Sequence, residues 1–142
     1  MSLFFVIEPE VSGGLGTNTV IDTSIHPPKV THLNYEFDDW LGDDLVESFP
    51  CFVITSLLAK GLNEKNFSGF ELDSVEISVS DVFYDVHSAF KLPDFKWLKV
   101  VGKAGIDDFG LSDDYRLVVS ENVMALFKNF KFLNADIEKY NV

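Results

Sequence analysis

The hydrophobic and polar positions of residues 115–140 follow three successive periods that predict a strand, a helix and a second strand. Residues 117–119 form a short β-branched apolar run, which is typical of a buried strand. From Leu133 to Glu138, apolar and polar residues alternate, as they do in a strand with one solvated face. Between these strands, apolar residues recur at positions i, i+3, i+4 and i+7 and therefore share one helix face, on which we expect Phe127 to be buried: Val123, Leu126, Phe127 and Phe130.

The residues at both ends of this predicted helix favour its formation. Ser120 precedes the helix, and its hydroxyl group can accept a hydrogen bond from a free amide of the first turn. Glu121 places a negative charge at the positive end of the helix dipole. Lys128 and Lys131 lie near the other end, where cations are favoured. We therefore expect the helix to begin at or just after Ser120.

Residues 52–75 repeat this pattern sixty-five positions upstream without a gap. Thr55 falls on Ser120, so a hydroxyl cap is retained, and Leu62 falls on Phe127. Gly61 falls on Leu126 and weakens the first helix, since glycine costs about 1 kcal/mol relative to alanine. We predict two repeated strand–helix–strand units, and a chance similarity of binary patterns is the alternative.

The remaining patterns are shorter and complete the expected fold. Further strands are expected at residues 3–7, 33–37, 72–79 and 97–101, with Trp97 in the core. The glycine-rich residues 12–17 predict a flexible loop, residues 38–47 an acidic turn, and residues 82–93 show no clear pattern. The prediction is an α+β fold with a mixed or antiparallel β-sheet and two main helices, and residues 1–142 are expected to form a single domain.

The net charge of −12 narrows the possible partners. Binding to nucleic acid is not expected, because neutralising phosphates requires lysine and arginine. Strong negative charge favours solubility and can also steer a basic partner. No apolar run is as long as a membrane span, the first residues lack the features of a signal peptide, and Cys51 is the only cysteine. We expect a cytoplasmic protein that does not bind membranes.

No motif indicates catalysis, a cofactor or a metal. Residues 12–17 contain only an isolated Gly-x-Gly, and the three histidines, His26, His32 and His87, lack the spacing of a helical zinc site. A Cys51–His pair could form in space, but a cysteine in an apolar strand is more typically a buried, inert thiol. Acidic doublets such as Asp107-Asp108 leave a carboxylate-based enzyme as an alternative, because the spacing of an acid pair is spatial.

The acidic segment 38–47 contains no basic residue, and it surrounds Trp40 with acids. These acids could attract a basic protein over a long range, and Trp40 could serve as a desolvated anchor. Alternatively, the acids only solvate a turn and Trp40 belongs to the core. The predicted partner-binding residues are Asp38, Asp39, Trp40, Asp43, Asp44 and Glu47.

Residues 50–140 resemble the immunity proteins of bacterial polymorphic toxin systems, in particular immunity family eleven. The resemblance lies in Pro93-Asp94-Phe95, the strand WLKVVG, Asp107-Asp108-Phe109, and RLVVSENVMALFKNF followed by LNADIEKY, with FVITSLLAKGL as the upstream unit. It implies a non-enzymatic, cytoplasmic protein that binds and neutralises a cognate toxin. The family has no catalytic residues to carry over. A small enzyme and a structural domain without a toxin partner are the alternatives.

Overall fold

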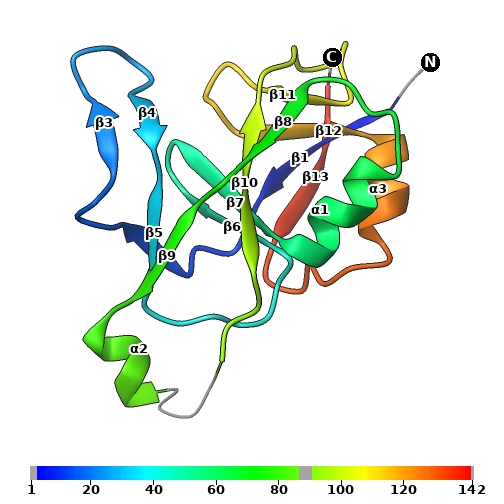
Figure 1. Ribbon diagram of the computed structural model, residues 1–142. Helices are drawn as coiled ribbons and strands as arrows, with labels where there is room; N and C mark the ends of the chain where they lie inside the picture. Colours follow the sequence, from blue (N-terminus) through cyan, green and yellow to red (C-terminus); the bar gives the residue numbers. More distant parts are fainter. Residues whose placement is uncertain (1–2, 87–90, 142) are drawn as a thin grey trace.

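The computed structural model describes residues 3–86 and 91–141, which form an α+β fold with two four-stranded sheets of the same plan (Figure 1). The first unit contains β6 (Leu45–Ser48), β7 (Cys51–Thr55), α1 (Ser56–Asn63), β8 (Phe70–Asp73) and β10 (Phe95–Val100), with strand order β6-β7-β10-β8. The second contains β11 (Phe109–Leu111), β12 (Leu117–Ser120), α3 (Glu121–Phe127), β13 (Asp136–Tyr140) and β1 (Phe4–Glu8), with strand order β11-β12-β1-β13.

The third strand of each sheet separates the two strands that the helix connects. β10 is antiparallel to both β7 and β8, and β1 is antiparallel to both β12 and β13. Each unit is thus a split β-α-β arrangement preceded by a hairpin strand. The first unit takes its inserted strand from the chain after β8, whereas the second takes it from the N-terminal part. The predicted repeat is confirmed, and β1 completes its second copy.

Both helices begin at the predicted caps. The Thr55 hydroxyl accepts a hydrogen bond from the backbone N–H of Leu58 at 3.2 Å, and the Ser120 hydroxyl accepts one from Val123 at 3.3 Å. Each hydroxyl also donates at 2.7 Å to an aspartate, Thr55 to Asp44 and Ser120 to Asp108.

Those two aspartates also tie the units to each other. The second carboxylate oxygen of Asp44 accepts a hydrogen bond from the backbone N–H of Lys131, beyond α3, at 2.7 Å. The second oxygen of Asp108 accepts one from the backbone N–H of Ser68, beyond α1, at 3.0 Å. Each unit therefore caps its own helix and holds the segment that follows the helix of the other unit.

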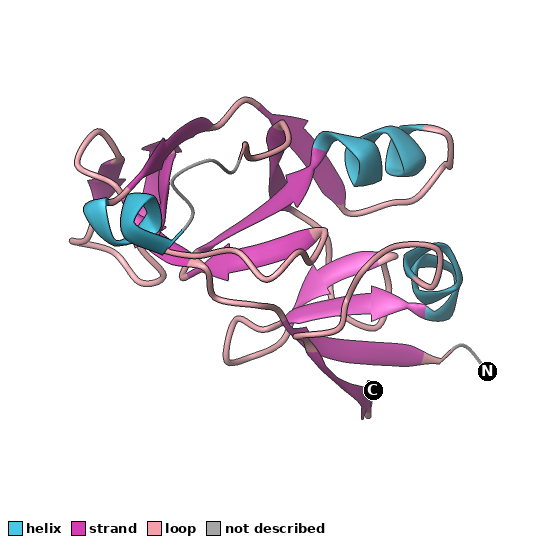
Figure 2. Ribbon diagram, turned by 90° about the horizontal axis from the view of Figure 1, so that it is seen from below, coloured by secondary structure: helices cyan, strands magenta, loops and turns pink. Residues whose placement is uncertain are grey.

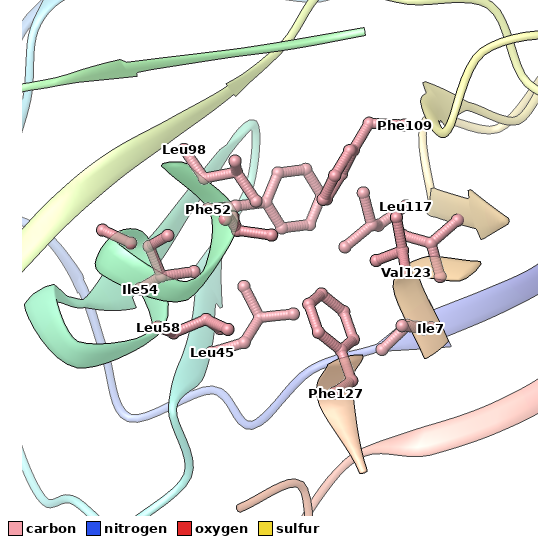
Figure 3. Packing of buried hydrophobic residues seen from close by; sticks show 13 residues of the cluster. Ile7, Leu45, Phe52, Ile54, Leu58, Leu98, Phe109, Leu117, Val123 and Phe127 are labelled. Carbon is pink, nitrogen blue, oxygen red and sulfur yellow. The ribbon is translucent and has the colours of Figure 1, made fainter. Parts of the chain in front are cut away.

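The main core lies between the two units, and Figure 3 shows side chains from both converging there. Leu62 and Phe127, which correspond in the repeat, are 0% and 1% exposed, so the predicted burial of Phe127 is confirmed. A Cβ at Gly61 would lie 3.1 Å from the ring of Phe130 and 3.8 Å from Leu126. The glycine therefore makes room for side chains of the second unit.

A third sheet covers the outer face of the first unit. It contains β2 (Gly13–Leu15), β5 (Asn34–Phe37) and β9 (Glu76–Val79), in the order β2-β5-β9, and β5 and β9 are parallel. Tyr35 and Phe37 are fully buried in this layer, and Trp97, on β10, packs in the same cluster at 6% exposure, as predicted. The remaining elements are a hairpin of β3 (Val20–Asp22) and β4 (Lys29–His32), and helix α2 (Asp81–Val86) (Figure 2).

One prediction from local pattern is wrong, and one segment without a pattern contains a helix. The glycine-rich residues 12–17 do not form a flexible loop but contain β2, where a Cβ at Gly13 would lie 1.9 Å from the backbone oxygen of Glu36. Glycine is needed there for close strand pairing rather than for mobility. Residues 82–93, which show no clear pattern, begin within helix α2, and residues 87–90 lie outside the described part of the chain.

The predicted strand at residues 133–138 begins later than its alternation suggests. β13 starts at Asp136, and the side chain of Leu133 is 87% exposed. The reason is tertiary, because the backbone N–H groups of Leu133 and Asn134 donate to the carboxylate of Asp43 instead of to a neighbouring strand. Helix α3 likewise ends at Phe127, before Phe130.

Candidate partner-binding surface

The acidic segment 38–47 is held in place by hydrogen bonds, and Asp43 lies in its interior. Asp43 is 1% exposed. Its carboxylate accepts hydrogen bonds from the backbone N–H groups of Leu133 at 3.0 Å and Asn134 at 2.8 Å, and from the side-chain amide of Asn134 at 3.1 Å. The structure therefore places Asp43 out of reach of a partner, where its charge stabilises the turn before β13.

Trp40 and Asp39 are only partly accessible. The Trp40 ring lies edge-on to Phe95 with centroids 5.8 Å apart, and its indole N–H donates to the backbone oxygen of Asp43 at 2.9 Å. Asp39 is half-buried and accepts a hydrogen bond from the backbone N–H of Trp40 at 2.7 Å. Asp38 is exposed, whereas Asp44 is half-buried.

Buried Glu10 binds the backbone of the same segment. Its carboxylate accepts hydrogen bonds from the backbone N–H groups of Leu41 at 2.9 Å and Asp43 at 3.3 Å. Burial raises the pKa of Glu10, although these two hydrogen bonds act in the opposite direction. Because the segment contains no basic residue, backbone amides rather than lysine or arginine compensate its inward-facing carboxylates.

Glu47 is separated from the other five predicted residues. It lies on β6 opposite Phe52, one residue before the position at which β6 ends and the chain turns through Phe49 and Pro50. Burial raises the pKa of Glu47 to about 7, and the negative charge of Glu8 adds to this effect. Glu47 therefore belongs to a different surface from Trp40.

Three aromatic rings from distant parts of the chain meet beside Glu47. His26 stacks on Phe49 with ring centroids 6.4 Å apart, and its edge meets Tyr115 at 5.3 Å. Phe49 and Tyr115 are 6.5 Å apart. Phe49 is 46% exposed, His26 is exposed and Tyr115 is half-buried. Sequence reasoning missed this cluster, since its only local signals are the neighbouring prolines of two turns.

Tyr115 has an uncommon backbone conformation. Its φ angle is 63°, a left-handed value that glycine adopts readily but a bulky residue rarely does. Its backbone N–H donates to the oxygen of Ser112 at 2.9 Å, and the N–H of Ser112 donates to the oxygen of Arg116 at 2.9 Å, which closes a tight turn between β11 and β12. Backbone strain of this kind is concentrated at functional sites.

Two hollows adjoin at Tyr115. The first has a volume of about 370 Å³ and is lined mainly by apolar side chains, among them Pro50, Trp97 and Val101. The second has a volume of about 390 Å³, and Phe49 and Tyr115 form part of its wall. An apolar hollow and a polar hollow thus share one aromatic side chain.

The second hollow is predominantly acidic. Four carboxylates line it, those of Glu8, Glu47, Asp114 and Asp136. Among the described residues, Arg116 is the one cation in its wall. Arg116 contacts Asp114 at 2.8 Å and Glu8 at 3.1 Å. A hydrogen bond from Ser112, together with Arg116, lowers the pKa of Asp114. We name the region of His26, Phe49, Tyr115, Glu8, Glu47 and Asp114 the Tyr115 surface.

Other kinds of site find little support in the described residues. Over residues 3–86 and 91–141, no group of three or more His, Cys, Asp or Glu side chains is arranged to hold a metal ion. Cys51 is 3% exposed and burial raises the pKa of its thiol to about 12, the opposite of what an activated nucleophile requires. His87 lies outside the described residues. No helix in the described part of the chain is long and apolar enough to cross a membrane.

Comparison with known proteins found no relative of this chain. No protein-family model, no curated protein and no solved structure matches the chain significantly.

Proposed function

We propose that the chain is a non-enzymatic immunity protein that binds a cognate bacterial toxin in the cytoplasm and neutralises it by covering its surface. The observation that carries the proposal is the Tyr115 surface, where exposed Phe49 and half-buried Tyr115 adjoin a hollow with four carboxylates and one cation. Aromatic residues are enriched among the side chains that dominate binding energy at protein interfaces. The resemblance of residues 50–140 to immunity proteins points to the same class of partner.

The charge of the chain supports a basic partner. A net charge of −12 on 142 residues produces a field that accelerates the encounter with a positively charged protein. A toxin that acts on nucleic acid is one such protein, because it must hold phosphates. Inhibition in this mechanism requires only steric occlusion of the toxin, and no bond is made or broken.

The alternative of a carboxylate-based enzyme has weaker support. It would place at least two acids with raised pKa values in one hollow, where one can donate and the other accept a proton. Glu47 lines the second hollow and its pKa is raised to about 7. Glu10, whose pKa is also raised, is instead hydrogen-bonded to the backbone of residues 41 and 43.

The test uses the protein encoded by the reading frame next to the gene for this chain. We expect this neighbouring protein to arrest growth when it is expressed alone in a bacterial host, and co-expression of the chain to restore growth. The purified proteins should form a complex that weakens as salt is raised, because salt screens exposed charges beyond about 8 Å at physiological ionic strength. A toxic neighbouring protein that neither binds the chain nor loses its toxicity on co-expression would overturn the proposal, and so would a neighbour without toxicity.

A further inference from the structure

The two repeated units differ in what covers their outer faces. In the first unit, the third sheet packs on the outer face of β7 and β10, and this contact buries Val53 and Trp97. In the second unit, the corresponding face of β12 and β1 forms only a small cluster of Phe4, Val6 and Val118, with Ala104 and Tyr140 at its border. Among the described residues, no further sheet packs on this face as the third sheet does on the first unit.

On β1 and β13, this face of the second unit carries three acids, Glu8, Asp136 and Glu138. Strand register places Glu8 opposite Asp136 and Val6 opposite Glu138, so these acids lie on one side of the sheet. Both Glu8 and Asp136 also line the second hollow, which continues to Phe49 and Tyr115. The Tyr115 surface therefore borders the acidic end of a sheet face on which, among the described residues, no third sheet packs.

We propose that the Tyr115 surface is the docking site for a basic segment of a partner protein, with an apolar side chain of that segment in the first hollow and a lysine or arginine in the second. This inference rests on the proposed function, and it names the surface and the chemistry of the partner. It assigns no direct contact to Asp38, Asp39 or Trp40.

The geometry of the two hollows defines this ligand. Phe49 and Tyr115 border the acidic hollow, so a cationic side chain that enters meets both carboxylates and aromatic faces, and cation–π attraction then adds to ion pairing. Arginine suits such a site because its planar guanidinium stacks on rings and binds carboxylates with two parallel hydrogen bonds. The adjoining hollow is lined mainly by apolar residues such as Pro50, Trp97 and Val101, with Lys29 and Lys99 also in its wall, and it can take a neighbouring apolar side chain.

In the second hollow, charge complementarity selects a cationic side chain over an acidic or apolar one. Arg116 is shared between Glu8 and Asp114, so its single charge is already engaged. Glu47 lies in the same hollow, where burial and, to a lesser extent, the negative charge of Glu8 raise its pKa. An incoming cation removes the repulsion between these acids, whereas an incoming acid adds to it.

A first experiment maps the surface without a toxin. The probe is a synthetic peptide with Arg-Leu-Arg at its centre and glycine–serine flanks, titrated into the ¹⁵N-labelled full chain. We expect the largest amide shift changes at residues 8, 47–49 and 114–116, and binding at least fivefold weaker for a control peptide with glutamine in place of arginine. Shift changes centred on residues 38–41, or equal binding of the glutamine peptide, would overturn the inference.

Two variants and a matched control test the residues involved. Phe49→Ser and Tyr115→Asn each remove a ring, and asparagine tolerates the positive φ of residue 115. Each should weaken peptide binding three- to tenfold. Glu71→Gln is the control, since Glu71 corresponds to Asp136 in the repeat but lies on β8 of the first unit, and it should leave binding unchanged. Amide spectra of each variant verify that the fold is retained.

A second experiment separates this inference from the proposed function. The combined Phe49→Ser and Tyr115→Asn variant is measured against the neighbouring-gene protein, and we expect its affinity to fall at least a hundredfold. Equal affinity of this variant and the wild type would overturn the docking site and leave the toxin partnership standing. Peptide binding at the Tyr115 surface without any binding of the neighbouring-gene protein would overturn the partnership and leave the docking site standing.

Discussion

Replacing Asp43 by asparagine tests whether the acidic segment is a structural element. Asparagine keeps one oxygen but places an NH₂ group, a donor, where the second carboxylate oxygen accepts hydrogen bonds. In the wild type, the two oxygens together accept three hydrogen bonds, of 3.0, 2.8 and 3.1 Å, from Leu133 and Asn134. At 1% exposure, water cannot replace the lost acceptor.

The expected cost follows from these contacts. Each hydrogen bond to a charged group contributes about 1.5–3 kcal/mol, and a buried donor left without a partner costs about 1–3 kcal/mol. Losing one of the three and weakening the other two should lower the free energy of unfolding by about 2–4 kcal/mol. For a chain of this size, that corresponds to a fall in Tm of roughly 6–15 °C.

The assay is urea and thermal unfolding followed by circular dichroism, with Asp38→Asn as the matched control. Asp38 is exposed, so its substitution makes the same change of charge in the same segment and should shift Tm by less than about 2 °C. If Asp43→Asn unfolds at the temperature of Asp38→Asn, the carboxylate does not hold the turn before β13. The acids of this segment would then have to be reconsidered as solvated, partner-facing groups.

Three more changes to the chain test its packing, its titration and its strand order. Phe127→Ala should lower the free energy of unfolding by about 3–5 kcal/mol in a denaturant titration, since Phe127 is 1% exposed, and an unchanged midpoint would place this helix face in solvent. Glu47→Gln should leave stability unchanged near pH 4 and raise it by on the order of 1 kcal/mol at pH 8, a figure reduced for solvent screening of a half-buried group. The sign follows because burial raises the pKa of Glu47 from the ordinary 4.5 to about 7, so between these pH values the folded state binds a proton that the unfolded state has lost. The free energy of unfolding of the wild type therefore falls as pH rises from 4.5 to 7, whereas that of the glutamine variant lacks this contribution. Melts that show the same difference between variant and wild type at both pH values would contradict this reasoning. A circular permutant with a short linker from residue 142 to residue 3 and new ends between residues 17 and 18 should fold with a Tm within about 5 °C of the wild type. The reason is that Phe4 and Tyr140 are paired neighbours on adjacent strands. A permutant that fails to fold would mean that β1 must precede the rest of the chain.

The sequence alone determined the features that depend on neighbouring residues. The 3.6-residue period placed α1 and α3, and short apolar runs placed the strands before them. The hydroxyls of Thr55 and Ser120 marked both helix starts, because cap, strand and helix face lie within about ten residues of one another. The same local logic revealed the repeat. It also predicted the burial of Phe127 and Trp97 correctly.

Tertiary structure decided the features that join distant residues. No local pattern tells that β1 lies between β12 and β13, or that Gly13 serves close strand pairing. Nor does one tell that Asp43 binds the backbone amides of residues 133 and 134, so that β13 starts later than predicted. The acidic segment has the same composition whether its carboxylates face solvent or backbone amides, and only the fold places Asp43 inside. Likewise, His26, Phe49 and Tyr115 become one surface only when three turns meet, since a contact between residues so far apart leaves no periodic trace in the sequence.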